Sequence, residues 1–319
     1  MPMTIWGENL TAVLCYHDLC KPRESGSWLK VDIDRFERQL VALKKIGTFV
    51  RPDALLEPSL LTRSRLNLLL TFDDGFINNL RLGLPVLKRH GVPALFFIST
   101  EYMESGEPFW FDRLIRPIEH YCLPGIDLRH LGLGEYSFSP VKGAKRWDDI
   151  QLLLEDVKKL DESQDGQLVD RILAVLLPDD HQANNFYEDD RPLNKDELMA
   201  MQRSGICCFG SHGHRHRILT KLGDDSLKEE LQQSRSILEE LLGEPVKHIS
   251  YPNGNVDSRV VENCREAGYL FGYTIAPGRV SPENDHFRIP RVMVGGFDTT
   301  ARVLINLARG LLRTGPQAE

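Results

Sequence analysis

The sequence has no long apolar run, little positive charge and few cysteines. No stretch of its 319 residues reaches the roughly 18 to 20 consecutive apolar residues that cross a bilayer, so we expect no transmembrane segment. The formal net charge of −7 argues against nucleic acid as a partner, because phosphate binding needs a basic patch. Residues 1–9 hold no basic region ahead of an apolar core, so the sequence predicts no secretory signal.

The six cysteines lack the spacing of a metal site and are typical of reduced, mostly buried thiols. Together with the missing signal, they predict a cytoplasmic protein. Hydrophobic content of 41% and charged content of 27% are ordinary for a globular protein. A chain of this length can bury a large core, and we expect one domain over residues 1–319.

Strands and helices alternate along most of the chain. Apolar patterns bounded by turn residues predict strands over 13–16, 66–72, 94–99, 206–210, 248–251 and 271–275. Helical spacing with glycine stops predicts helices over 34–45, 76–90, 195–204, 225–242, 258–267 and 300–313. Repeated strand–helix units of this kind imply an α/β fold with a parallel sheet.

Two adjacent carboxylates, Asp73 and Asp74, end the apolar run 68–72 and are followed by Gly75. This pattern favours a buried strand that delivers acids to its carboxyl end. Asp-Asp-Gly alone is usually a tight turn, since these residues suit turn dihedrals. However, an acid that closes a buried strand is costly without a partner, which favours a functional site.

Two histidines, His212 and His216, lie four residues apart after the expected strand 206–210. On a turn of helix this spacing places both imidazoles on one face, close enough to share a divalent cation. The spacing alone is common on solvated helix faces. Two histidines and one aspartate would form a three-ligand site open to water and substrate, with the second aspartate as a base. That combination predicts a metal-dependent hydrolase.

Three ordered motifs resemble those of the polysaccharide deacetylase family, carbohydrate esterase family 4. They are Thr71-Phe72-Asp73-Asp74-Gly75, Ser211-His212-Gly213-His214-Arg215-His216 and Ser250-Tyr251-Pro252-Asn253-Gly254. The resemblance covers roughly residues 10–100 and 190–295. It implies that the α/β fold is a distorted, incomplete (β/α) barrel.

The resemblance also implies the roles of individual residues. Asp73 matches the catalytic base, and Asp74, His212 and His216 match the metal ligands. The ligand set favours Zn²⁺ and also suits Co²⁺, Ni²⁺ or Fe²⁺. His214 falls on a variable position between the ligands and has no implied role.

Two departures from the family pattern point to its circularly permuted branch, which includes the poly-N-acetylglucosamine deacetylases. Ser250 stands where many members have an arginine that pairs with the catalytic aspartate, and no histidine follows Arg291 to serve as the acid. In the permuted branch the first strand supplies that histidine. The resemblance therefore implies His17 as the general acid and Arg291 as the substitute arginine. The alternative for His17 is a strand-end histidine bonded to backbone, and His286 is the rival acid.

The expected reaction also needs a proton donor for the leaving amine and a group that stabilises the oxyanion. We expect His17 to lie across the metal from Asp73, with Asp18 or a backbone carbonyl fixing its tautomer, and to protonate the leaving amine. The oxyanion would be stabilised by the metal and by a backbone N–H of the Tyr251–Asn253 loop, for which Asn253 is the candidate. Pro252 has no backbone N–H to donate, and its rigid ring would orient the backbone N–H of the next residue, Asn253.

Residues 101–190 break the strand–helix rhythm and predict a mainly helical insertion with loops at 161–166 and 178–190. Trp110 lies in an aromatic cluster at 108–113. The cluster either docks the insertion on the barrel or forms a wall on which a sugar ring stacks. The helix expected at 300–313 either packs on the barrel or forms an oligomer interface.

The sequence thus favours removal of an N-acetyl group from an amino-sugar substrate, with release of acetate. Two alternatives stay open: hydrolysis of a non-sugar amide of the ureide or imide type, and a non-catalytic carbohydrate-binding homologue. Without a secretory signal, we expect a nucleotide-linked, lipid-linked or small soluble sugar as substrate rather than an extracellular polymer.

Overall fold

A computed structural model describes residues 10–22, 24, 27–62, 65–160, 167–177, 191–280 and 285–313. The expected loops at 161–166 and 178–190 lie outside the described residues, as does the segment 1–9, in which no secretory signal is expected. Among the helices within these ranges, none has the length and apolarity needed to span a bilayer.

The described residues form an eight-stranded sheet in the order β11-β10-β9-β6-β5-β1-β12, with β4 also paired to β5. Every pairing in this sheet is parallel. The strands are β1 Thr11–Tyr16, β4 Gly47–Phe49, β5 Leu66–Phe72, β6 Ala94–Ile98, β9 Cys207–Ser211, β10 His248–Ser250, β11 Phe271–Tyr273 and β12 Val292–Met293. The predicted α/β fold, a distorted and incomplete barrel, is confirmed.

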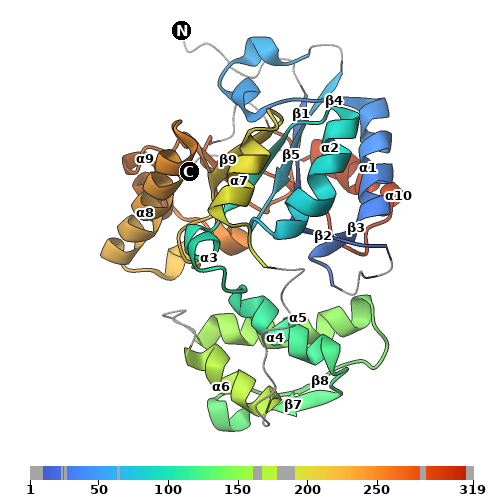
Figure 1. Ribbon diagram of the computed structural model, residues 1–319, viewed down its shortest axis with the longest axis vertical. Helices are drawn as coiled ribbons and strands as arrows, with labels where there is room; N and C mark the ends of the chain where they lie inside the picture. The colour runs from blue at the N-terminus through green and yellow to red at the C-terminus, as the bar shows by residue number, and fades with distance from the viewer. Residues whose placement is uncertain are drawn as a thin grey trace.

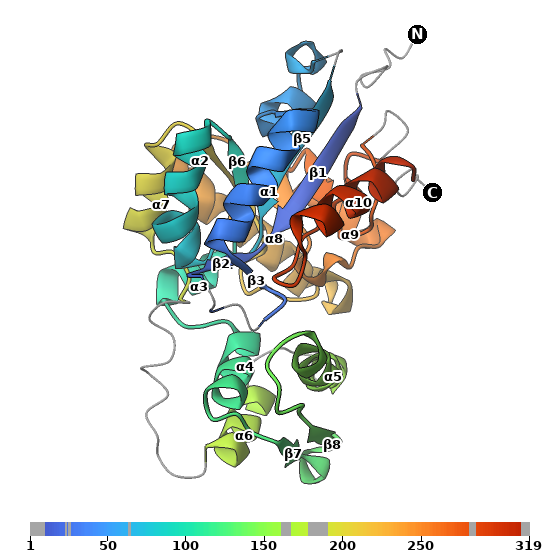
Figure 2. The same cartoon turned by 90° about the vertical axis from the view of Figure 1, so that its right-hand side faces the viewer.

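Helices pack around this sheet (Figures 1 and 2). They are α1 Ile33–Ile46, α2 Leu84–His90, α7 Lys195–Gln202, α8 Asp224–Leu242, α9 Ser258–Glu266 and α10 Thr300–Leu311. In α8 the apolar residues Leu227, Leu231 and Leu238 recur at helical spacing and are buried against the sheet. Gly243 then ends the helix in the left-handed conformation, with φ of 69°. The glycine stop predicted for α8 is thus confirmed.

The helix expected over 76–90 is interrupted. Helical residues begin at Ile77, a π-helical turn occupies Asn79–Gly83, and α2 follows from Leu84. Pro85, in the first turn of α2, has no backbone N–H to donate to the turn before it. The expected bounds are therefore confirmed within one residue, and only the π-helical turn was not predicted.

Several short elements were not predicted from the sequence. β2 (Asp18–Cys20) and β3 (Lys30–Asp32) form a separate parallel pair beside α1. Short 3-10 helices occupy Pro52–Leu55, Pro58–Leu60, Arg129–Leu131, Leu219–Lys221 and Pro252–Gly254. Segments of two to four residues are too short to show a period, so tertiary packing rather than pattern decides them.

The segment expected as an insertion forms a mainly helical lobe next to the barrel (Figure 2). Helix α3, Thr100–Ser105, begins the segment and packs on the barrel beside α8. The lobe itself consists of α4 Trp110–His120, β7 Gly125–Asp127, β8 Glu135–Ser137, α5 Ala144–Leu160 and α6 Gln167–Leu176, with β7 and β8 paired antiparallel. The lobe has an apolar core of its own, which includes Phe109, Leu114, Ile118, Ile150 and Leu153. The aromatic cluster that contains Trp110 leads directly into α4.

Candidate metal centre and catalytic site

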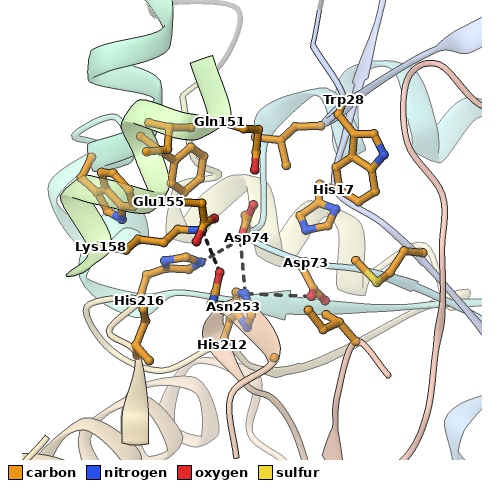
Figure 3. Close-up of a pocket in the computed structure, with 18 of the residues that line it drawn as sticks. His17, Trp28, Asp73, Asp74, Gln151, Glu155, Lys158, His212, His216 and Asn253 are labelled. Atoms are coloured by element: carbon orange, nitrogen blue, oxygen red, sulfur yellow. Dashed lines mark hydrogen bonds and ion pairs between the residues drawn. The ribbon is translucent and has the colours of Figure 1, made fainter. Parts of the chain in front are cut away.

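The carboxyl ends of β5 and β9, which flank β6 in the sheet, bring the first two motifs together. Asp73 and Asp74 follow β5 and are each 3% exposed. His212 follows β9 and is 2% exposed. Because parallel strands end at the same edge, motifs separated by more than a hundred residues of sequence share one site (Figure 3).

Asp74, His212 and His216 form a group that can hold a metal ion. The Nε2 atoms of His212 and His216 lie 3.3 and 3.2 Å from Asp74 Oδ1. All three candidate ligand atoms lie within 4.8 Å of one another. His212 Nδ1 lies 2.8 Å from the carbonyl oxygen of Ser250, so this nitrogen carries the proton and leaves Nε2 free to bind a cation. The donor set and its convergence fit a divalent metal.

The prediction of a helical turn at His212–His216 is wrong. These residues lie in a loop after β9. Gly213 has φ of 77° and His216 has φ of 55°, both in the left-handed region. Glu230 shapes the loop: its carboxylate accepts the Arg215 N–H at 2.6 Å, and a Cβ on Gly213 would lie 2.9 Å from the same oxygen. The two histidines therefore meet through loop curvature rather than helical spacing.

Asp73 is held by Arg291 and Ser250. Arg291, fully buried, donates from Nη1 to Asp73 Oδ1 and from Nη2 to Asp73 Oδ2, both at 2.7 Å. The Ser250 hydroxyl donates to Asp73 Oδ2 at 3.0 Å. The structure thus brings Arg291 to the aspartate as expected, and Ser250, the departure from the family motif, contributes a hydrogen bond of its own.

Both aspartates are ionised despite their burial. Burial opposes ionisation of Asp73, but the Arg291 guanidinium and His212 outweigh it and lower its pKa to about 2. Burial likewise opposes ionisation of Asp74, but hydrogen bonds with His212 and His216 hold its pKa far below the usual range. One carboxylate can therefore ligate a cation while the other accepts a proton.

His17 follows β1 and lines the same cavity as the aspartates. Its ring packs edge-on against Trp28 with centroids 5.6 Å apart. Burial lowers the pKa of His17, although Asp74 and Asp73 act to raise it. His286, the rival acid, instead lines a different groove and stacks on Phe271.

Two expectations about His17 are wrong. Asp18 does not fix its tautomer, because the Asp18 carboxylate accepts the Leu19 N–H and pairs with Lys30 at 3.3 Å. His17 Nδ1 is buried and has no hydrogen-bond partner among the described residues. His17 also lies on the same side as Asp73, since a ring nitrogen comes within 4.8 Å of the Asp73 carboxylate.

Cys15, His17 and Asp73 form a second convergent group, with candidate atoms also within 4.8 Å of one another. It is poorly suited to a cation, because the positive charge of the Arg291 guanidinium, which pairs with both Asp73 oxygens, repels one there. Burial raises the pKa of the Cys15 thiol well above its usual value, so the thiolate that binds metals is disfavoured. The metal-binding geometry therefore belongs to the first group.

A cavity of about 620 Å³ lies over these residues, between the barrel and the lobe. Of the residues expected to contact substrate, Trp110, Tyr251 and Asn253 line it. Pro252 is buried beside them and does not line the cavity. Tyr251 is fixed by a hydrogen bond from its hydroxyl to the Phe287 carbonyl at 2.8 Å.

Sequence reasoning missed one whole wall of this cavity. Helix α5 supplies Trp147, Asp148, Gln151, Leu154, Glu155 and Lys158. Trp28 and Met293 were missed as well. The only signal in the sequence for α5 was the spacing of its apolar residues, which predicts a helix but not the side that faces the metal ligands.

The family model described as "Polysaccharide deacetylase" matches residues 62–120 and 148–272. The Staphylococcus epidermidis protein named poly-beta-1,6-N-acetyl-D-glucosamine N-deacetylase is 26% identical over 117 residues, which are 34% of this chain and 40% of that protein. A Staphylococcus aureus protein of the same name is 25% identical over 118 residues, which are again 34% of this chain and 40% of that protein. The chain thus matches less than half the length of these relatives.

Solved structures share the fold over nearly the whole chain. A polysaccharide deacetylase from Bacillus cereus gives a TM-score of 0.60 at 19% identity, covering 94% of this chain and 69% of that one. The Streptococcus pyogenes deacetylase PplD, solved in complex with acetate, gives a TM-score of 0.59 at 18% identity. The match covers 93% of this chain and 98% of that one. IcaB from Ammonifex degensii gives a TM-score of 0.60 at 18% identity, and the match covers 94% of this chain and 97% of that one. At these identities the likeness establishes the fold.

Proposed function

Because this chain belongs to the polysaccharide deacetylase family, we propose that it is a metal-dependent hydrolase that removes the acetyl group from an N-acetylated amino sugar. The observation that carries the proposal is the convergence of Asp74, His212 and His216 within 4.8 Å, next to the ionised Asp73. Amide hydrolysis by water requires a carboxylate that can accept a proton from the water, placed beside a three-ligand metal site.

Asp74, His212 and His216 would hold the cation, and their nitrogen and oxygen donors suit zinc. When bound, such a cation supplies a Lewis acid that polarises the amide carbonyl and lowers the pKa of water. Asp73 accepts the proton of the attacking water, and Arg291 keeps its carboxylate ionised and oriented for that purpose.

Two further groups of the chain complete the hydrolysis. His17, beside Asp73 in the cavity, donates a proton to the departing amine nitrogen as the C–N bond breaks. The backbone N–H of Asn253, in the loop after β10, supplies a hydrogen bond to the developing oxyanion. Water and the acetamide are consumed, and acetate and a free amino sugar are released.

Acetate release from a short N-acetylglucosamine oligomer tests the proposal, with zinc added and with zinc removed by a chelator. We expect zinc-dependent acetate release, and no ammonia or urea from a linear ureide under the same conditions. Turnover of the ureide without turnover of the sugar would replace this proposal with the non-sugar amide alternative. Sugar binding without turnover in the presence of zinc would favour a carbohydrate-binding homologue.

A further inference from the structure

Helix α5 of the lobe faces the metal ligands across the cavity. Its cavity-lining residues include Trp147, Gln151, Leu154, Glu155 and Lys158, which recur every three or four positions and so share one face of the helix. Figure 3 shows the side chains of Gln151, Glu155 and Lys158 on the opposite side of the cavity from His212 and Asp73. A substrate at the metal centre must therefore fit between the barrel and this helix.

The two walls are joined at one end. The Lys158 ammonium donates to Asn253 Oδ1 at 2.8 Å and to Glu155 Oε1 at 2.7 Å. Asn253 belongs to the barrel loop after β10, and its backbone is fixed in the left-handed region with φ of 59°. The Lys221 ammonium, also from the barrel, donates to the Lys158 carbonyl oxygen. These bonds form a bridge between α5 and the barrel, which we name the Lys158–Asn253 bridge.

The bridge lies next to one of the metal ligands. Lys158 and His216 line the same cavity, and Figure 3 shows their side chains next to each other. In Figure 3, Lys158 and Asn253 meet on the His216 side of Asp74, while His17 and Trp28 lie on the other side. A polymer bound along the cavity needs room on both sides of the reacting acetamide. The bridge removes that room on the His216 side.

The charge of the cavity limits the substrate further. Apart from histidine, Lys158 is the only basic residue among the described residues that line it, and its ammonium is already bound to Glu155. Asp148 and Glu155 add negative charge to the same wall. A diphosphate is normally bound by arginine or lysine side chains with unengaged donors. This cavity is therefore poorly suited to a nucleotide-linked sugar.

Aromatic rings form part of the apolar lining of the cavity. Three of the four tryptophans in the sequence, Trp28, Trp110 and Trp147, line the cavity. Flat aromatic faces pack well on the C–H faces of uncharged sugar rings. A volume of about 620 Å³ is in the range that holds one small ligand rather than an extended polymer.

We propose that the cavity accepts the terminal residue of an uncharged amino-sugar conjugate, and that the Lys158–Asn253 bridge stops the chain from continuing past the metal centre. The inference rests on the proposed deacetylase function. It adds a specificity that the metal centre does not provide, because under the proposed function the ligands and Asp73 act on the acetamide alone.

The test is the position of deacetylation in linear N-acetylglucosamine pentamers, one β-1,4-linked and one β-1,6-linked, mapped by tandem mass spectrometry with the zinc-loaded protein. We expect acetate loss from a single terminal residue of at least one pentamer. Lys158→Met keeps the side-chain stem but removes the bridge, and should raise the share of internal deacetylation by at least about tenfold, which corresponds to about 1.4 kcal/mol. Lys159→Met removes an exposed neighbouring ammonium and should leave the pattern unchanged.

A second arm compares kcat/KM for the uncharged methyl glycoside of N-acetylglucosamine with that for its nucleotide diphosphate conjugate. We expect the uncharged glycoside to be preferred by at least about tenfold. Internal deacetylation by the wild-type protein, an unchanged pattern in Lys158→Met, or a preference for the diphosphate would each overturn the inference while leaving the proposed function intact. No acetate from any of these substrates would remove the proposed function, and this inference with it.

Discussion

The barrel edge formed by β5 and β9 and the α5 face of the lobe meet across one cavity, yet they bring different side chains to it. The barrel edge presents buried ionisable groups, each with a partner of opposite charge, such as Asp73 with Arg291. The α5 face presents one aromatic ring, an amide and charges that are exposed or half-exposed. Reactive groups therefore lie in the segments that directly follow the strands of the rigid sheet, and contact groups lie on an added element that can vary without disturbing them.

The same contrast holds for buried carboxyls. Burial opposes ionisation of Asp73 in the barrel, but cationic neighbours bring its pKa down to about 2. Burial also opposes ionisation of Asp112 in α4 of the lobe, and there Arg116 and Lys30 do not outweigh it, so its pKa rises to about 7. If the comparison is right, barrel variants should change the rate of chemistry, and lobe variants should change binding or stability.

The largest effect is expected for Asp73→Asn. The amide cannot accept the proton of the attacking water, so kcat should fall by about 10² to 10⁴, the usual contribution of a general base. Metal content, measured by elemental analysis, should stay at the wild-type level because Asp73 is not a proposed ligand. Asp196→Asn, an exposed change on α7, serves as the control. Near-normal turnover by Asp73→Asn would mean that another group accepts the proton.

A smaller loss, by about 10² or more, is expected for His17→Ala because the leaving amine loses its proton donor. Burial lowers the pKa of His17, so the protonated donor becomes scarce as pH rises and the wild-type rate should fall on the alkaline side. The variant should retain its metal and lose this alkaline limb, as a pH–kcat profile can show. An alkaline limb that persists in His17→Ala and disappears in His286→Ala would reverse the assignment.

On the lobe side, Trp110→Ala should act on binding rather than on chemistry. Removing a ring from the cavity wall should raise KM by about fivefold to tenfold, equivalent to about 1 to 1.4 kcal/mol, with little change in kcat. Trp110→Phe retains a ring and should restore most of the affinity. A drop in kcat at unchanged KM would show that the lobe takes part in the chemistry, contrary to the comparison.

The smallest effect is expected for Asp112→Asn and concerns stability. The folded-state pKa of Asp112, about 7, lies above its unfolded value of about 3.9, so the folded protein binds this proton more tightly. That contribution to stability is complete at low pH and is lost as pH rises through about 7. The asparagine variant avoids the loss.

Thermal unfolding of the metal-free proteins at pH 5 and pH 8 measures the difference. The Tm of Asp112→Asn relative to the wild type should increase as pH rises between these values. An equal difference at both pH values would show that Asp112 is ionised in the fold and that the lobe carboxyl behaves like those of the barrel.

The sequence predicted the barrel well because its elements are long enough to show a period and are bounded by clear stops. β5 has the expected bounds, Leu66–Phe72, and α8 differs from its expected start by one residue. The grouping of Asp73 and Asp74 with the histidines followed from the rule that parallel strands end at one edge.

The features that the sequence did not reveal depend on contacts between distant segments. His212 and His216 meet through a loop shaped by Glu230, for which the four-residue spacing gave the wrong geometry. The Lys158–Asn253 bridge joins residues 95 apart that belong to no common pattern. Ser250 looked like the loss of a partner for Asp73, and only the structure shows its hydroxyl donating to that carboxylate.

The most direct test of the account is a zinc titration of the chelator-treated protein, with acetate release from an uncharged N-acetylglucosamine glycoside as the signal. We predict that the wild-type rate rises with added zinc and levels off at about one ion per chain, as expected for a single three-ligand site. His212→Ala and His216→Ala should show neither tight zinc binding nor recovery of the rate. Full activity without metal, or a wild-type titration curve from either variant, would contradict the assignment of Asp74, His212 and His216 as the metal centre.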